Sequence, residues 1–203
     1  MLRKIQPILF AATLGLVAAG CQNDHHDHTA SAANAAGSNS ILRAADMGAD
    51  VKEAVAMVHG TKGNEKVHGI IKFTDTGNGV RVMAHVTGLE PNSEHGFHIH
   101  EFGDCTDMDK AMSTGGHFNP DKHQHGKPGD AQSHPGDMGN LKADASGMAM
   151  AEITLPAASL TGKNAILGRG VIVHEKPDDY SQPTGNAGGR IACGVIGVAQ
   201  IKK

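Results

Sequence analysis

The sequence predicts an all-β fold, a sandwich or small barrel of about seven or eight strands. The composition has 27 Gly and 8 Pro but only 3% aromatic residues, which favours short strands, many turns and a core of small aliphatic side chains. β-Branched runs of strand length recur along the chain, separated by turns that contain Gly and Asn. No long helical period interrupts them. The length of 203 residues suits one ordinary domain plus extensions.

Residues 1–20 have the pattern of an export signal. Arg3 and Lys4 supply positive charge, residues 8–19 are apolar, and small residues precede Cys21. The apolar run is shorter than the about 20 residues that span a bilayer, so a permanent membrane helix is disfavoured. We therefore expect residues 1–20 to be a signal peptide.

Cys21 distinguishes two kinds of export signal. Small residues directly before a cysteine resemble the bacterial lipobox, in which the cysteine is lipidated and becomes the mature N-terminus. The alternative is ordinary secretion, because Val17-Ala18-Ala19 could also serve a simple signal peptidase. The first interpretation predicts a lipoprotein of the bacterial cell envelope, periplasmic and in contact with a membrane only through a lipid at Cys21.

Residues 21–49 are predicted to form a flexible tether. They are rich in Ala, Ser, Asn, Asp and His and have no sustained apolar period. The stretch "DHHDHT" at residues 24–29 has two interpretations, a loose metal-capturing cluster and a merely polar linker. The folded domain is predicted to occupy residues 50–203.

The domain contains seven clear strand signals and one long irregular segment. Residues 103–140 fit neither a strand nor a helix period and are rich in Gly, Pro, Asp and His, which is typical of a functional loop. The strand signals are "VAMVHG" (55–60), "KVHGIIKF" (66–73), "VRVMAHVTGL" (80–89), "HGFHIHEF" (95–102), "GMAMAEITL" (147–155), "GVIVHE" (170–175) and "CGVIGVAQI" (193–201).

Histidines are the candidate metal ligands. His98 and His100 point to the same face of a strand, so they can reach one ion together. Further donors follow at His117, His125, His134, Asp137 and His174. Three imidazoles and a carboxylate can close a tetrahedral zinc site, whereas four imidazoles suit Cu(II). Two four-coordinate ions would then share one histidine, and His117 is the natural candidate because it lies between the strand pair and the later loop ligands.

Several ordered motifs resemble the copper/zinc superoxide dismutases. They are "GFHIHEFGDC", "GGHFNP", "HGKPG", "HPGDMGN", "VHEKPDD" and "TGNAGGRIACGVIGVAQ", and the resemblance covers roughly residues 51–201. It implies an eight-stranded Greek-key β-barrel with long metal-binding and electrostatic loops. It also implies two cofactors, copper and zinc.

The resemblance assigns roles to individual residues. It implies copper ligands at His98, His100, His117 and His174, and zinc ligands at His117, His125, His134 and Asp137. His125 is preferred over His123 because it lies at the family's spacing from the bridging histidine. Asp178 would link a copper ligand to a zinc ligand through hydrogen bonds, and Arg190 and His117 would be catalytic. His59, His68, His85 and His95 are expected to have no metal role.

The resemblance also pairs Cys105 with Cys193. The compartment supports this pairing, because an oxidising environment favours a disulfide once Cys21 carries lipid. Two buried free thiols are the alternative.

The implied function is superoxide dismutation, the conversion of superoxide to oxygen and hydrogen peroxide by redox cycling of copper, with zinc structural and bridged to copper through His117. Residues 175–189 are shorter than the equivalent loop of the cytosolic eukaryotic members, which leaves substrate steering and a homodimer open. Arg190 is expected to attract the anion, with Lys127 or Lys176 as the alternative. The net charge of -3 gives no basic field for nucleic acid.

Two other functions are compatible with parts of the sequence. A metal-buffering envelope lipoprotein would use "DHHDHT" and the histidines without turnover, but it would not require Arg190 or Asp178. A structural or copper-delivery relative would lack some ligands, and the expected ligand set is complete.

Overall fold

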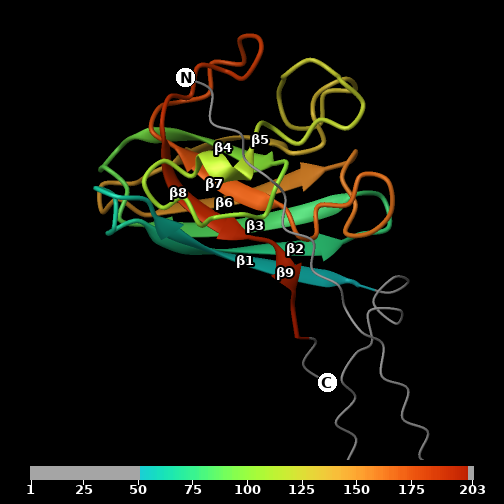
Figure 1. The fold of residues 1–203 in the computed structure, drawn as a ribbon, viewed down its shortest axis with the longest axis horizontal. Coiled ribbons are helices and arrows are strands. Elements are labelled where there is room, and N and C mark those ends of the chain that lie inside the picture. The colour runs from blue at the N-terminus through green and yellow to red at the C-terminus, as the bar shows by residue number, and fades with distance from the viewer. Residues whose placement is uncertain (1–50, 201–203) are drawn as a thin grey trace, which may run out of the picture. The chain divides into compact units, whose positions relative to one another are not determined.

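The computed structural model describes residues 51–200, so the predicted signal peptide, Cys21 and the tether lie outside the described residues. The described part is an antiparallel β-barrel, shown as a ribbon in Figure 1, which confirms the predicted fold class. Within it, no helix is long and apolar enough to cross a membrane.

The strands form one sheet in the order β5-β4-β7-β8-β1-β2-β3-β6, with β9 paired to β1. The two end strands, β5 and β6, follow one another in the chain and lie side by side, which nearly closes the barrel. The elements are β1 (Glu53–Gly60), β2 (His68–Asp75), β3 (Val80–Thr87), β4 (Glu94–His100), the 3-10 helix η1 (Met112–Thr114), β5 (Asp137–Lys142), β6 (Ala149–Leu155), β7 (Gly170–His174), β8 (Arg190–Val195) and β9 (Gly197–Val198).

The connections have Greek-key character. β3 pairs with β2 and β6, but the chain leaves β3 to form β4 between β5 and β7. The chain likewise leaves β6 to form β7 between β4 and β8. Consecutive strands are therefore separated in the sheet at both crossings.

Strands β1, β2, β3 and β6 form one half of the barrel, with one face in the core and the other in water. β3 alternates strictly, with Val80, Val82, Ala84 and Val86 buried and the residues between them exposed. β2 contributes Ile71 and Phe73 to the same core, and both are fully buried. This alternation is the pattern expected of an antiparallel sheet with one solvated face.

Strands β4 and β7 are buried on both faces. Every residue of β7 and all but the first of β4 are buried. Segment 101–136, drawn in green to yellow in Figure 1, supplies His117 and His125 to the donor groups described below, and segment 175–189, drawn in red-orange, supplies Asp178, whose carboxylate accepts a hydrogen bond from His98 on β4. The strand histidines that the sequence predicts as metal ligands, His98, His100 and His174, therefore lie on strands that have no solvated face.

The prediction of an irregular segment over 103–140 is wrong at its C-terminal end. Asp137 begins β5, and Asp137 to Gly139 are buried against β4. The stretch "DMGNLK" has no β-branched residue, so its strand is set by tertiary pairing rather than by local propensity. The last strand signal, predicted from Cys193, also begins earlier, at Arg190, and is divided into β8 and β9.

Candidate metal centre

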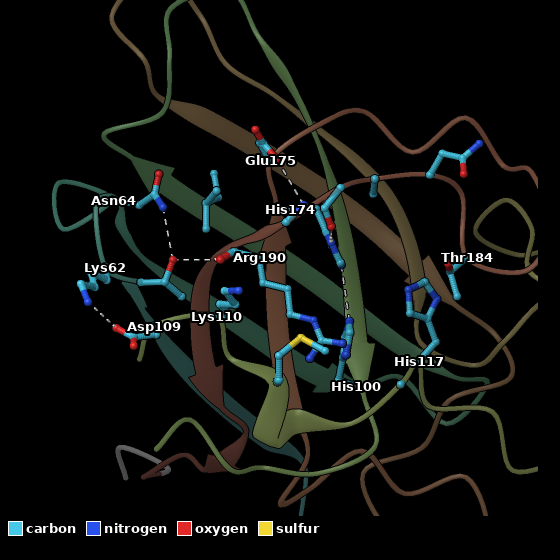
Figure 2. Close-up of a pocket in the computed structure, with 18 residues that line it drawn as sticks. Lys62, Asn64, His100, Asp109, Lys110, His117, His174, Glu175, Thr184 and Arg190 are labelled. Atoms are coloured by element: carbon cyan, nitrogen blue, oxygen red, sulfur yellow. Dashed lines mark hydrogen bonds and ion pairs between the residues drawn. The ribbon is translucent and has the colours of Figure 1, made fainter. Parts of the chain in front are cut away.

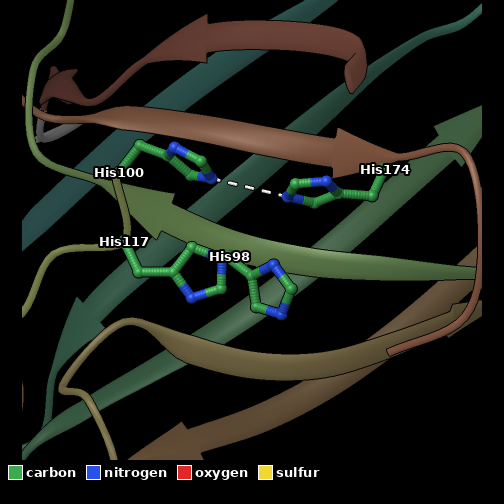
Figure 3. A group of neighbouring side chains, drawn as sticks. All are labelled: His98, His100, His117 and His174. Carbon is green, nitrogen blue, oxygen red and sulfur yellow. Dashed lines mark hydrogen bonds between the residues drawn. The ribbon is translucent and has the colours of Figure 1, made fainter. Parts of the chain in front are cut away.

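Four buried imidazoles form the first donor group. His98 and His100 come from β4, His174 ends β7, and His117 is joined to His100 by an isolated bridge. The Nε2 atoms of His100 and His174 lie 3.4 Å apart, and the ring centroids of His98 and His117 lie 4.2 Å apart. Figure 3 shows the four rings gathered in one group.

Shifts in strand-pairing register lie next to two of these histidines. The pairing of β4 with β5 shifts between Gly96 and His98, and that of β7 with β8 shifts between Val173 and His174. Such irregularities re-orient side chains next to a site. They place a histidine from each of two neighbouring strands in the same group.

A second donor group surrounds the carboxylate of Asp137. Its Oδ1 lies 3.0 Å from His125 Nδ1, 3.0 Å from His134 Nδ1 and 3.4 Å from His117 Nδ1. His98 also lies within reach of this group, because it shares a set of close donor atoms with His117, His125 and Asp137. Three imidazoles and one carboxylate are a tetrahedral zinc donor set.

Asp178 connects the two groups. His98 Nε2 lies 2.8 Å from its Oδ2, and His125 Nε2 lies 2.9 Å from its Oδ1. An N–H at Nε2 of each ring that donates to Asp178 leaves both Nδ1 atoms with a lone pair. This carboxylate therefore fixes the tautomer and the orientation of one ring from each group.

Glycine is required beside this carboxylate. Gly185 has a positive φ of 74°, and a Cβ there would collide with Asp178 Oδ1 and lie 2.7 Å from His125 Nε2. No larger residue fits this position without displacing the link between the two groups. Gly185 thus allows its loop to lie directly against Asp178 and His125.

Buried nitrogen atoms without partners show that the residues fit metal ions. The Nδ1 atoms of His98, His117 and His125 are buried and have no hydrogen bond. His117 Nδ1 and His125 Nδ1 both lie close to Asp137 Oδ1. An N–H at either nitrogen would not point at this oxygen, so neither makes a hydrogen bond to it. A buried polar atom without a partner is costly, and a metal ion would satisfy all three.

The pKa values of the imidazoles support the same conclusion. Burial lowers the pKa of His117 to about 4 and that of His174 to about 3, and burial also lowers the pKa values of His98 and His100. All four rings are therefore neutral at physiological pH. The neutral imidazole is the form that binds a metal.

The two aspartates stay ionised. Burial alone would raise the pKa of Asp137, but the imidazoles that converge on it outweigh that effect and hold the pKa well below its usual range. Asp178 is similar, because hydrogen bonds from His125 and His98 outweigh burial and lower its pKa. For His125, burial lowers the pKa, but hydrogen bonds and charge from Asp137 and Asp178 outweigh burial and raise the pKa to about 9.

A hollow of about 650 Å³ lies against the first group. Arg190 begins β8 and lines this hollow with His100, His117 and His174, and Figure 2 shows it beside His100. Its guanidinium donates to the Ala111 and Gly115 carbonyl oxygens, each at 2.7 Å, and is half buried. A fixed positive charge therefore stands next to the imidazoles, where a small anion could enter.

Two lysines that the sequence did not single out also line the hollow. They are Lys62, from the β1–β2 connection, and Lys110, just before η1. Neither sits in a recognisable motif, so only the fold brings them beside Arg190. Lys127 and Lys176, the expected alternatives for steering, are not among the lining residues in the described part of the chain, and Lys127 lies over the ring of Tyr180 at 5.5 Å.

The predicted disulfide between Cys105 and Cys193 is confirmed, with a Cα–Cα distance of 5.9 Å. Cys193 lies in β8, and the pair packs with Ala111 and Ile172. Because Ala111 accepts a hydrogen bond from Arg190, the disulfide connects the long loop to the positioning of this charge.

The remaining histidines of the described chain lie outside both groups. His123 Nδ1 faces the carbonyl oxygen of Ser133 at 3.4 Å, and His95 is buried between Ser93 and the His174 carbonyl oxygen. His59, His68 and His85 are exposed on β1, β2 and β3. None of the five belongs to the two groups of converging donors found among residues 51–200.

Comparison with known proteins gives the same family as the motifs. The family described as copper/zinc superoxide dismutase (SODC) matches residues 67–196. A solved structure named "Crystal Structure Analysis of the clock protein EA4" is 40% identical with a TM-score of 0.67, and the match covers 75% of this chain and 98% of that one. The family match spans more than half of the chain and includes both donor groups, so this chain belongs to the copper/zinc superoxide dismutase family, whose metals are copper and zinc.

Proposed function

We propose that this protein is a superoxide dismutase that converts superoxide to oxygen and hydrogen peroxide. One observation carries the proposal: two buried donor groups have His98 and His117 in common, and the first of them opens on a hollow with a fixed arginine. This reaction needs a redox centre, a second metal that holds the shared ligand, and a positive charge that attracts the anion.

In the proposed assignment, copper is held by the four imidazoles of the first group and zinc by the donors around Asp137. His98 is assigned to copper and His134 to zinc, although His98 lies close to both groups. The reason is that His98 converges with His100 and His174, whereas His134 Nδ1 lies 3.0 Å from Asp137 Oδ1. His117 would be a ligand of both ions, because it belongs to both donor groups.

Copper supplies reversible one-electron chemistry when bound, whereas zinc has none. Arg190 attracts the superoxide anion into the hollow and orients it against His100 and His174. Lys62 and Lys110 extend the positive charge toward solvent, with Asp109 paired to Lys62 at 3.2 Å. The net charge of -3 would repel an anion, so this local charge must outweigh it.

His117 is proposed to move the proton. Its ring faces the hollow on one side and Asp137 on the other. When Nε2 is not engaged in the first group, it can hold a proton while Nδ1 remains held beside Asp137. That proton is then available to the reduced substrate in the hollow.

Two other functions are weighed against this one. A metal buffer would bind both ions without turnover, and the name of one relative gives a second function, that of a clock protein. Family membership alone does not exclude either. The half-buried Arg190, held by two carbonyl oxygens and Thr114 at the wall of the hollow, favours turnover, because neither alternative requires it.

We also propose export to the periplasm with a lipid on Cys21 holding the protein at a membrane of the cell envelope. The support is the sequence pattern of residues 1–21. Mass spectrometry of the mature N-terminus distinguishes a diacylated Cys21 from a chain cleaved without lipidation. A homodimer is a further prediction that sedimentation can test.

The function is tested by superoxide loss in the metal-loaded protein, measured with and without a copper chelator. We expect rapid loss that the chelator abolishes and that added copper restores. His123→Ala is the matched control, because His123 lies in the same loop as the zinc ligands and outside both groups. Metal-loaded wild-type protein with no turnover, but with both ions bound, would identify a buffer instead.

A further inference from the structure

Three methionines lie on or next to the outer face of β3 and β6, namely Met83 on β3, Met150 on β6 and Met148 directly before β6. Seven of the nine methionines lie in residues 51–200, and of these only Met138 is buried. Met150 on β6 is 73% exposed and Met83 on β3 is 47% exposed. Methionine normally fills gaps in cores, so thioethers that stand in water have no packing role to explain them.

Three of these thioethers surround one exposed histidine. His85 Nε2 lies 3.1 Å from Met148 Sδ, and the β3–β6 register places His85 directly opposite Met150. Met83 precedes His85 by two residues on the same face of β3. Met83, His85 and Met150 line one hollow of about 470 Å³.

The chemistry of these donors selects a soft cation. Thioether sulfur binds Cu(I) in preference to hard divalent ions, and imidazole suits copper as well. Directly opposite side chains on a sheet have Cβ atoms about 5 Å apart, a separation that flexible methionines can close around a shared ion. The nearest acidic side chain in the hollow, Glu152, lies opposite Met83 and is paired with Arg81 at 3.8 Å.

We propose that His85, Met148 and Met150 form a surface site for Cu(I), with Met83 as an additional thioether at its edge. The donor set is one imidazole nitrogen and two thioether sulfurs. None of these residues belongs to the two buried groups found in the described chain. The site is therefore a second place for copper, in its reduced form, on the solvated half of the barrel.

The test is an anaerobic titration of full-length protein with Cu(I), after both buried groups have been loaded with copper and zinc. A chromophoric Cu(I) chelator competes for the ion and reports the number of equivalents that the protein retains. We expect wild type to retain one equivalent more than the variants His85→Gln and Met148→Leu/Met150→Leu. Met57→Leu is the matched control, since Met57 is 57% exposed on β1 and lies across from Ile70 rather than from His85.

All four proteins keep the histidines of residues 24–29, so any Cu(I) held there contributes equally. Equal retention by all of them would overturn the site and leave the His85–Met148 contact as a simple N–H···S hydrogen bond. Methyl NMR with Ag(I), a redox-inert soft ion, gives a second readout. The Met148 and Met150 methyl signals should shift and the Met57 signal should not, and unshifted Met148 and Met150 signals at saturation would contradict the site.

Dismutase activity separates this inference from the proposed function. The three variants should retain wild-type activity, because no substituted residue lines the hollow of Arg190. Wild-type protein without activity would refute the dismutase proposal while leaving the Cu(I) titration interpretable.

Discussion

The two halves of the barrel differ in what covers them. In β1, β2, β3 and β6 buried and exposed residues largely alternate, whereas β4 and β7 are buried on both faces. The solvated half supplies Ile71 and Phe73 to the core but no donor to either buried group. The covered half supplies His98, His100 and His174.

This difference in cover explains why the converging donors lie where they do. A strand histidine in the solvated half, such as His85, is exposed to water. In the covered half, burial lowers the pKa values of His98 and His174 and keeps these rings neutral. Covering a sheet face with loops thus gives histidines at ordinary strand positions the neutral form that can bind a metal.

The largest expected effect comes from removing one donor in the covered half. His174→Ala should abolish superoxide dismutation while zinc remains bound, because the donors around Asp137 are untouched. Asp137→Ala should lower zinc affinity first and leave some copper-dependent activity. Metal analysis and activity of both variants check the pair, and preferential loss of zinc from His174→Ala would mean that the two ions are assigned to the wrong groups.

A core substitution in the solvated half should affect stability alone. Phe73 is fully buried on β2, so Phe73→Ala should lower the free energy of unfolding by about 3–5 kcal/mol. Denaturant unfolding measures this loss, and metal analysis of the folded fraction measures its effect on the centre. A native fraction depleted in copper or zinc would show that the two halves are not independent.

Cys105→Ser removes the covalent link between the long loop and strand β8. The disulfide closes a separation of 88 residues, for which the chain-entropy relation gives about 4–5 kcal/mol as an upper figure. We expect easier unfolding, and a reductant should lower the wild-type midpoint but leave the variant unchanged. Equal wild-type midpoints with and without reductant would mean that the bond contributes nothing to stability.

Asp178→Asn tests the coupling of the two groups. The amide replaces one carboxylate oxygen with an NH2 group, which is a donor and cannot accept from an imidazole N–H, and it removes the negative charge. Affinities for copper and zinc should both fall by about 10–100-fold. Competition with chelators of known affinity measures each ion, and a change in one ion alone would show that Asp178 does not couple them.

Arg190 should show the smallest effect, on kcat/KM and its salt dependence. Arg190→Glu should lower kcat/KM by about tenfold or more, and Arg190→Lys less, with copper and zinc contents unchanged. Wild-type rates should fall as salt rises, since charges are screened beyond about 10 Å at 0.1 M. The Glu variant should lose or reverse this dependence.

Unchanged salt slopes in both variants would remove Arg190 from steering. The same measurement on Lys62→Glu and Lys110→Glu would then show whether the other lining charges carry the effect. Lys127→Glu is the control, because Lys127 lies over Tyr180 and outside the hollow.

The sequence predicted most of the fold because most strands carry their own signal. β3 alternates in the sequence as it does in the structure, and turn residues separate it from β2. β5 was missed, since "DMGNLK" has neither alternation nor β-branched residues and becomes a strand only by pairing with β4.

In the candidate site, too, some residues could be predicted from the sequence and others could not. Motif spacing was enough to name the seven donors, which the structure gathers around His117 and Asp137. Spacing could not identify Lys62 and Lys110, because their proximity to Arg190 depends on how the β1–β2 connection meets the long loop. Nor could it show that Gly185 must lack a side chain beside Asp178.

The most direct test of the shared-histidine metal centre is anomalous diffraction from crystals of the metal-loaded protein, recorded at the copper and zinc absorption edges. We expect a copper peak among His98, His100 and His174, a zinc peak beside Asp137, and the ring of His117 between the two. A single peak, exchanged metals or a His117 ring that contacts only one ion would contradict this assignment.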